Sequence, residues 1–367
     1  MKRLDEKLLR IRAGQYRKSD FIIADAKDTD MGSGCTTPAP VRNNDGSAAT
    51  APRRLRTYLD QIADIVKQDI VDIMLMSPSN LERMVEEGVF RDSAVQPAIR
   101  ANEATDCWGG IRGGKYTHLP SRNFRTAKLL RVMHGTTNPA PGAATTGTDL
   151  GLYSLTFNND LEADIASLTD FAEFRDEVAE IGFRYFLEVF NPNVPSGLDP
   201  VDVPKFVNDH ILRALAGVMR ADRPQFLKIP FNGPAALEEL AAYDPSLIVG
   251  VMGGGAGTTR DTFELLYQAE RYGARVALFG RKINLAESPL AIVRYMRAVV
   301  DGAISPNEAV KSYHGELQAQ GVRPSRPLVE DNVITEAALK LGSTGDSSLS
   351  GGAAPLAAIT DRRQRLA

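Results

Sequence analysis

The sequence predicts a closed (β/α)8 barrel, and three observations lead to this prediction. Short apolar runs alternate with segments of helical periodicity from about residue 20 to residue 300, as in repeated βα units around a parallel sheet. Eight such runs can be counted, which is the number that closes this barrel. No run near the N-terminus is followed by the Gly-x-Gly-x-x-Gly spacing of a dinucleotide-binding fold, which disfavours an open doubly wound sheet.

The predicted elements follow one another in the order strand, helix, strand. The strands are expected at residues 21–26, 71–77, 96–103, 151–157, 183–190, 225–230, 247–252 and 274–280. Helical periodicity covers residues 55–67, 161–181, 203–219, 235–243 and 259–272, and two added helices are expected at 306–320 and 331–341. We therefore expect one domain over residues 1–341, followed by a poorly ordered tail over residues 342–367, which is rich in Ser, Gly and Ala.

The composition is that of a globular protein that acts on small molecules. Hydrophobic residues make up 43% of the 367 residues, enough for a full core. The net charge of -3 gives no electrostatic reason to expect nucleic acid or a membrane surface as a partner. The N-terminus lacks the apolar stretch of a signal peptide, so we expect a cytoplasmic protein. The two cysteines, Cys35 and Cys107, are expected to be free thiols.

Two connections are longer than ordinary turns. Residues 29–52 follow the first predicted strand, and residues 104–147 follow the third. Because both follow the C-terminal ends of strands, they are expected to lie over the barrel mouth as lids or substrate loops. Mobile surface insertions are the alternative. The second connection is cationic and suits an anionic substrate.

The run Phe226-Leu-Lys-Ile-Pro-Phe231 places a lysine, Lys228, inside an apolar strand. Burial disfavours the ammonium form of a lysine, and the neutral amine is a nucleophile that can attack a carbonyl group. A nearby cation, Lys27 or Arg281, would disfavour the ammonium form further. The alternative is a strand-end lysine whose ammonium group reaches solvent.

Asp25 and Glu188 also lie on apolar strands, where an unpaired carboxylate is costly. Each is therefore either a functional group or a partner in a structural ion pair. A carboxylate beside an iminium ion can take a hydroxyl proton during bond cleavage and return it later. Asp25, Glu188 and the neighbouring Lys27 are thus candidate catalytic residues alongside Lys228.

A glycine-rich loop, Gly253-Gly-Gly-Ala-Gly-Thr-Thr259, follows the seventh predicted strand, and Gly280-Arg281 follows the eighth. Backbone N–H groups at such a loop and helix start attract anions, and these two loops form the usual phosphate site of the barrel class. Glycine in tight turns is the alternative explanation. The predicted phosphate-binding residues are Gly253, Gly254, Gly255, Gly280 and Arg281.

Other polar residues at the expected mouth give weaker signals. Asn102 and Asn158 are candidate substrate-binding residues, and a magnesium site is the alternative use of them and of Glu103, Asp106, Asn159 and Asp160. The four histidines show no metal-ligand spacing, and no Gly-x-Ser-x-Gly elbow is found. A zinc-dependent aldolase and a serine hydrolase are therefore disfavoured, and we expect neither a metal nor a cofactor.

Over residues 20–300 the chain resembles the class I, Schiff-base aldolases of the barrel superfamily that includes fructose-bisphosphate, tagatose-bisphosphate and sulfofructose-phosphate enzymes. The resemblance implies that Lys228 forms the Schiff base, that Asp25 transfers a proton and that Glu188 is a dehydration or proton-relay acid. It also implies that the glycine loop and Arg281 bind a substrate phosphate. The chain departs from the glycolytic enzymes because strand four carries no lysine, and neither Tyr153 nor Tyr185 can be assigned as an acid–base tyrosine.

These observations predict a class I aldolase-type lyase that cleaves or forms a carbon–carbon bond in a phosphorylated ketose or related sugar acid. Two alternatives stay open: a catalytically weak sugar-phosphate binding or regulatory protein on the same barrel, and an acyl or ketol transferase that uses the same lysine. A homo-oligomer is expected.

Overall fold

The computed structural model describes residues 2–42, 48–255 and 257–343. Residues 344–367, and with them nearly all of the predicted tail, lie outside the described residues. Within the described residues, no helix is long and apolar enough to cross a membrane. Cys35 and Cys107 are both free thiols.

Eight parallel strands form the barrel, in the spatial order β10-β9-β8-β5-β4-β1-β12-β11. They are β1 (Ile22–Lys27), β4 (Ile73–Met76), β5 (Gln96–Arg100), β8 (Leu150–Thr156), β9 (Arg184–Phe190), β10 (Leu227–Lys228), β11 (Gly250–Met252) and β12 (Val276–Phe279). The two edge strands meet at a parallel bridge between Ile229 and Val251. Here the N–H of Ile229 donates to the carbonyl of Gly250 at 2.9 Å. The predicted closed barrel is thereby confirmed, and each predicted strand range overlaps one strand of the barrel.

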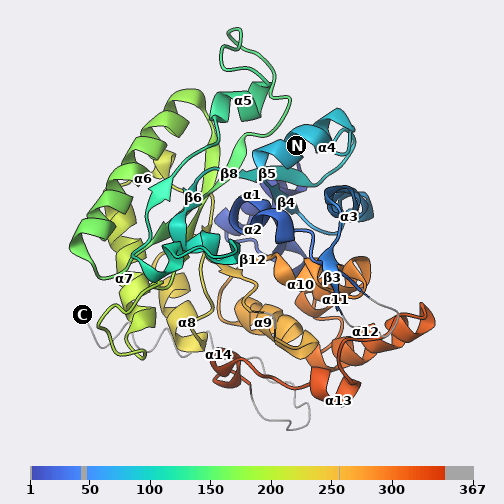
Figure 1. The fold of residues 1–367 in the computed structure, drawn as a ribbon. Helices are drawn as coiled ribbons and strands as arrows, with labels where there is room; N and C mark the ends of the chain where they lie inside the picture. The colour runs from blue at the N-terminus through green and yellow to red at the C-terminus, as the bar shows by residue number, and fades with distance from the viewer. Residues whose placement is uncertain (1, 43–47, 256, 344–367) are drawn as a thin grey trace.

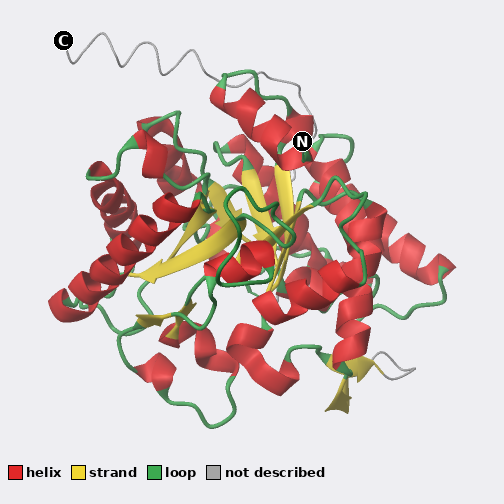
Figure 2. Ribbon diagram, turned by 90° about the horizontal axis from the view of Figure 1, so that it is seen from above, coloured by secondary structure: helices red, strands yellow, loops and turns green. Residues whose placement is uncertain are grey.

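Helices surround the strands as an outer ring (Figure 1), and the perpendicular view shows the strands enclosed by them (Figure 2). Helices outside the strands include α3 (Leu55–Gln68), α4 (Pro78–Glu86), α5 (Leu129–His134), α6 (Leu161–Ile181), α7 (Val203–Ala216), α8 (Pro234–Tyr243), α9 (Thr259–Arg271), α11 (Pro289–Val300) and α12 (Pro306–Ala319). Local signals fix their ends: Asp160 caps α6, and Thr258 with Asp261 forms a capping box on α9. Helices α4, α5 and α11 were not predicted.

The barrel interior is filled by alternate residues of the strands. Ile22, Ala24 and Ala26 of β1 belong to this inner cluster, together with Leu4 and Leu8 of helix α1 (Arg3–Arg12). Because strand side chains alternate between faces, the intervening residues of each strand point outward to the helices. Helix α1, which was not predicted from the sequence, closes the N-terminal end of the barrel.

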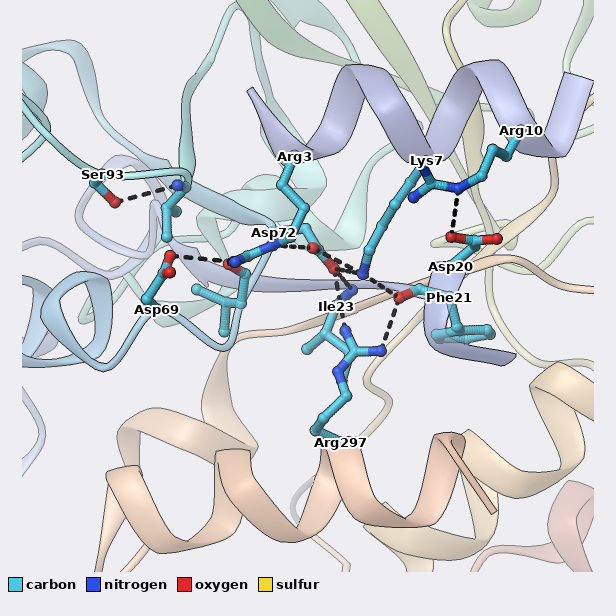
Figure 3. Close-up of polar contacts among 12 residues, drawn as sticks. Arg3, Lys7, Arg10, Asp20, Phe21, Ile23, Asp69, Asp72, Ser93 and Arg297 are labelled. Carbon is cyan, nitrogen blue, oxygen red and sulfur yellow. Dashed lines mark hydrogen bonds and ion pairs between the residues drawn. The ribbon is translucent and has the colours of Figure 1, made fainter. Parts of the chain in front are cut away.

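A charged group of residues fastens α1 to this end of the barrel (Figure 3). Asp72, just before β4, is fully buried and pairs with Lys7 at 2.9 Å, with Arg3 at 2.8 Å and with Arg297 of α11 at 3.1 Å. Its carboxylate also accepts the N–H of Ile23 at 2.9 Å. Burial lowers the pKa of Lys7 to about 8, although Asp72 opposes the change. We call Arg3, Lys7, Asp72 and Arg297 the base cluster.

The chain after α12 differs from the prediction. The helix expected at residues 331–341 is replaced by two short helices, α13 (Leu328–Asp331) and α14 (Ala337–Lys340), separated by the non-helical 332–336 segment. This segment contains three β-branched residues in a row, Val333-Ile-Thr335, which lowers its helix propensity. Its backbone N–H groups also have partners outside a helix, since those of Thr335 and Glu336 donate to Asp261.

Candidate active site

Five polar side chains gather inside the barrel at the C-terminal ends of its strands. Ser154, Glu188 and Lys228 lie at one level, because Ser154 pairs in register with Glu188, and Glu188 with Lys228. Each follows an inner-cluster residue by two positions, so each side chain points inward. Arg100 of β5 and Asp28, directly after β1, complete the group. We call Asp28, Arg100, Ser154, Glu188 and Lys228 the mouth cluster.

Glu188 connects the members of this cluster. One carboxylate oxygen contacts the ammonium group of Lys228. The other accepts hydrogen bonds from Ser154 Oγ at 2.6 Å and from Arg100 Nη2 at 3.0 Å. The Lys228 side chain is 7% exposed and that of Glu188 is 2% exposed, so the pair is buried. The structure therefore brings together two residues that the sequence singled out, Lys228 and Glu188.

Arg100 joins Glu188 to a second carboxylate. Its Nε donates to Asp28 Oδ2 at 2.6 Å, and its Nη1 donates to Ser154 Oγ at 2.7 Å. Burial opposes ionisation of Asp28 and Glu188, but the charges of Arg100 and Lys228 outweigh it and hold the pKa of each carboxyl below its usual value. The cluster thus holds two carboxylates against two cations in a buried space, where isolated charges would be costly.

The structure does not bring Asp25 or Lys27 into this cluster. Their side chains form a separate, fully buried ion pair at 2.8 Å. They alternate along β1 with the inward-facing Ala24 and Ala26, so their side chains point outward to the helices. In keeping with this, Asp25 interacts electrostatically with Tyr58 of α3. The expected convergence of Asp25 with Lys228 was therefore wrong.

The reason is a matter of strand parity, since a shift by one residue moves a side chain to the opposite face. Inward-facing positions on β1 are 22, 24 and 26, and the next one, 28, carries the carboxylate that reaches the barrel interior. Burial raises the pKa of Asp25 and lowers that of Lys27, and each partner opposes the shift of the other. Asp28 takes the place that Asp25 was expected to fill.

Asn102 and Asn158 act within the protein. Asn102 is fully buried; its Nδ2 donates to the carbonyl of Ser154 at 3.0 Å, and its Oδ1 accepts the N–H of Ser154 at 2.7 Å. Asn102 thereby positions Ser154 instead of facing a substrate. Asn158 Oδ1 accepts the N–H of Asn193 at 3.0 Å, whereas its buried Nδ2 has no hydrogen-bond partner among the described residues.

The two long connections meet above the mouth cluster. A Cβ atom on Gly32 of α2 (Asp30–Ser33) would lie 2.5 Å from the carbonyl oxygen of Cys107, which lies in the 3-10 helix over Thr105–Gly110. From this roof, Cys107 Sγ lies 3.9 Å from Arg100 Nη1, and Asp106 Oδ2 accepts a hydrogen bond from Thr156 Oγ1 at 2.5 Å. Burial raises the pKa of Cys107, although Arg100 opposes the shift, so its thiol stays neutral.

Further contacts hold the second connection in place. Strand β6 (Glu103–Ala104) pairs with β7 (Asn123–Phe124), and Trp108 packs edge-on against Phe124 with ring centroids 4.8 Å apart. Asn193, after β9, donates to the carbonyl of Leu119 at 2.8 Å. These contacts favour the lid interpretation of this connection over a mobile surface insertion.

The predicted phosphate loops also lie at the mouth. At two of their glycines, a larger residue would clash with neighbouring atoms. A Cβ atom on Gly280 would lie 2.8 Å from the carbonyl oxygen of Ala26, and one on Gly253 would lie 2.5 Å from the Phe279 ring. Arg281 Nη2 donates to the carbonyl of Gly254 at 3.1 Å. The two loops therefore adjoin, as predicted.

Asp28, Arg100 and Ser154 are the members of the mouth cluster that were not predicted from the sequence, and Asp28 was missed because of strand parity. A signal for Arg100 was available, because a guanidinium within the strand Gln96–Arg100 needs a buried acidic partner. Ser154 is a small polar residue in the strand Leu150–Thr156. The sequence of this strand does not distinguish a functional serine from one that serves only packing. Among the described residues, no group of three or more His, Cys, Asp or Glu side chains is arranged to hold a metal ion.

No protein-family model and no curated protein sequence matches the chain. Solved structures of similar fold do. An archaeal fructose-1,6-bisphosphate aldolase, with its catalytic lysine covalently bound to the carbinolamine intermediate of the substrate, is 14% identical over 82% of this chain and 100% of its own, with a TM-score of 0.56. The fructose-bisphosphate aldolase of Slackia heliotrinireducens is 13% identical over 85% of this chain and 91% of its own, with a TM-score of 0.59.

A protein of Corynebacterium glutamicum is 17% identical over 82% of this chain and 98% of its own, with a TM-score of 0.53. At such identities the likeness is one of fold, and a fold of this kind hosts many activities. The chain thus has the (β/α)8 barrel fold that is also found in Schiff-base aldolases.

Proposed function

We propose that this protein is a lyase that makes or breaks a carbon–carbon bond through a Schiff base on Lys228. The observation that carries the proposal is the buried contact between Lys228 and Glu188 at the C-terminal end of the barrel, the end from which barrel enzymes draw their catalytic groups. A lysine serving only solubility has no need of a buried carboxylate partner. The barrel fold shared with aldolases adds support.

The reaction begins with transfer of the Lys228 ammonium proton to a carboxylate or water, which frees the amine. The amine adds to the substrate carbonyl carbon, its nitrogen loses one proton, the oxygen takes up two protons, and water leaves to give an iminium ion. The iminium carries the same charge as the ammonium it replaces, so Glu188 stabilises both forms without a change in net charge.

Bond cleavage then needs a base for the hydroxyl group of the substrate. Asp28 is the base we propose, because it is ionised, faces the same space as Lys228 and is held by Arg100. Removal of the hydroxyl proton forms a new carbonyl, the carbon–carbon bond breaks, and its electron pair moves into the iminium to give an enamine. Protonation of the enamine carbon and hydrolysis release the second product and restore the amine.

The proposed substrate is a phosphorylated ketose or related sugar acid, with its phosphate at the loops that carry Gly253 to Gly255 and Gly280-Arg281. Arg281 and the backbone N–H groups of these loops are suited to such a group. No metal takes part in the proposed reaction.

Borohydride reduction tests the proposal directly, because it converts an iminium into a stable secondary amine. The protein is incubated with fructose 1,6-bisphosphate and other carbonyl compounds, with and without borohydride, and its intact mass is measured. A mass increase that requires both reagents supports the Schiff base. A sugar-phosphate binding protein would give no adduct, and activity abolished by EDTA without any adduct would replace the mechanism with a metal-dependent one.

A further inference from the structure

The 332–336 segment runs along the start of helix α9, beside the predicted phosphate loop. Thr258 Oγ1 donates to the carbonyl of Val333 at 2.6 Å. The N–H groups of Thr335 and Glu336 donate to Asp261 Oδ1 at 2.8 Å and 3.2 Å. The backbone of the segment is therefore fastened to the same turn that offers N–H groups to an anion.

A second attachment fixes the residue before the segment. Asp331 accepts the N–H of Thr259 at 2.8 Å through one carboxylate oxygen and contacts His314 Nε2 of α12 at 2.8 Å through the other. These contacts hold the backbone at Glu336 beside the glycine-rich loop.

The carboxylate of Glu336 lies on the glycine-rich loop. A Cβ atom on Gly254 would lie 3.2 Å and 3.3 Å from the two carboxylate oxygens, and one on Gly255 would lie 3.8 Å from the nearer of them. Gly254 also has a φ of +65°, a conformation that favours glycine. The loop thus holds a negatively charged oxygen pair where the sequence predicted a phosphate.

The charged groups facing Glu336 come from two elements. Lys282 and Arg281, on α10 (Arg281–Asn284), attract its carboxylate, whereas Asp261 on α9 repels it. Burial raises the pKa of Glu336, and Lys282 opposes the shift. Lys282 Nζ also lies 3.4 Å from the carbonyl oxygen of Thr258, at the start of α9. Two cations therefore attract one side-chain carboxylate that lies on the loop, as they would attract an external oxyanion.

We propose that Glu336 is an internal competitor for this anion site, so that a phosphate or sulfate group binds only when the Glu336 side chain turns away or is protonated. The identity of the anion as the phosphate of a substrate rests on the proposed function; the competition itself does not. Because the backbone is fastened and the side chain is only half-buried, rotation of that side chain is sufficient to open the site.

Sulfate is the probe, because it keeps its charge between pH 5 and pH 8. Its affinity is measured by titration calorimetry for the full chain, for Glu336→Gln, which keeps the side-chain shape, and for Glu336→Ala. Glu330→Gln is the matched control, since Glu330 is an exposed carboxylate on the adjacent helix α13. At pH 8 we expect Glu336→Gln and Glu336→Ala to bind sulfate at least about tenfold more tightly than the unaltered chain, because a like charge leaves the site.

Lowering the pH should narrow this difference, because a protonated Glu336 no longer repels sulfate from the loop. Glu330→Gln should behave as the unaltered chain does. Equal sulfate affinity in the unaltered chain and in both Glu336 variants at pH 8 would overturn the inference, as would a failure of all of them to bind sulfate. Because the assay needs no carbonyl substrate, the absence of a borohydride adduct would count against the proposed function alone.

Discussion

The two ends of the barrel carry buried charge clusters of similar composition but different construction. In the base cluster, one carboxylate, that of Asp72, forms ion pairs with three cations and accepts a hydrogen bond from a backbone N–H. Helix α1 covers it. In the mouth cluster, two carboxylates share two cations, and one of the cations is a lysine at the end of a strand. The roof above it consists of short helical turns within the two long connections instead of one long packed helix.

This difference separates a structural role from a chemical one. The cations of the base cluster come from helices and hold elements together, so their energy is expected to appear in stability. The groups of the mouth cluster come from strand ends, where the rigid barrel positions them and where loops can be exchanged. The comparison predicts that substitutions at the base change unfolding and that substitutions at the mouth change turnover.

The largest effect is expected at the mouth, for Lys228→Met. Methionine nearly matches the volume of the lysine stem and removes the amine, so the fold should persist while turnover falls by at least about 1000-fold. Turnover and circular dichroism are measured together, with Lys115→Met as control, because Lys115 is an exposed lysine in the long mouth connection. Retained turnover in Lys228→Met would remove the chemical role of this cluster.

At the base, Asp72→Asn should cost about 3–5 kcal/mol of unfolding free energy, because it leaves the buried Lys7 and two partly buried arginines without their carboxylate. Asp69→Asn is the matched control: Asp69 also pairs with Arg3, but it is 52% exposed, and its loss should cost less than about 1 kcal/mol. Urea unfolding gives both values. If Asp72→Asn instead lowered turnover of the folded protein without a loss of stability, the assignment of a structural role to the base cluster and a chemical role to the mouth cluster would be wrong.

Asp25 and Asp28, near the end of β1, allow a structural role and a chemical role to be compared within one strand. Asp28→Asn should slow bond cleavage by about 100-fold or more while the borohydride adduct still forms, because only proton transfer is lost. Asp25→Asn, on the outward face, should leave turnover of the folded protein within about twofold of the original. A slower Asp25→Asn with an unaffected Asp28→Asn would reverse the assignment of the base.

The smallest effect concerns pH. Lys7 has a pKa of about 8 in the folded protein against 10.5 as its ordinary value, so between these values the unfolded chain binds more protons. The unfolding free energy of the unaltered protein, relative to Lys7→Met, should therefore rise by about 1–2 kcal/mol from pH 7.5 to pH 9.5. Urea unfolding across this range measures the difference, and the exposed Lys67→Met should show no such rise. If the difference in unfolding free energy between the unaltered protein and Lys7→Met did not change with pH, the lowered pKa of Lys7 would be contradicted.

The fold was predictable because each barrel strand is a run of apolar residues with its own turn signals. Helix α1 was not, because its pattern, Arg3-Leu-Asp-Glu-Lys-Leu-Leu-Arg10, is that of any amphipathic surface helix, and its docking depends on Asp72 far along the chain. The helix expected at residues 331–341 was wrong because tertiary hydrogen bonds to Asp261 replaced helical ones.

Of the site, the sequence identified which strands carry charge but not which face each charge occupies. Lys228 and Glu188 were selected and do lie together, whereas Asp25 was selected in place of Asp28. Both aspartates follow the same apolar run, and only the parity of the strand separates them. Small residues at positions 24 and 26 were the available signal for the inward face, because the narrow barrel interior admits little volume there.

Mapping the borohydride adduct to one residue tests whether Lys228 forms the Schiff base. The protein is reduced in the presence of a carbonyl substrate, digested, and sequenced by tandem mass spectrometry. We expect the added mass on Lys228 in the unaltered chain and no added mass in Lys228→Met. An adduct on Lys27, on Lys282 or on any other lysine, with Lys228 unmodified, would contradict it.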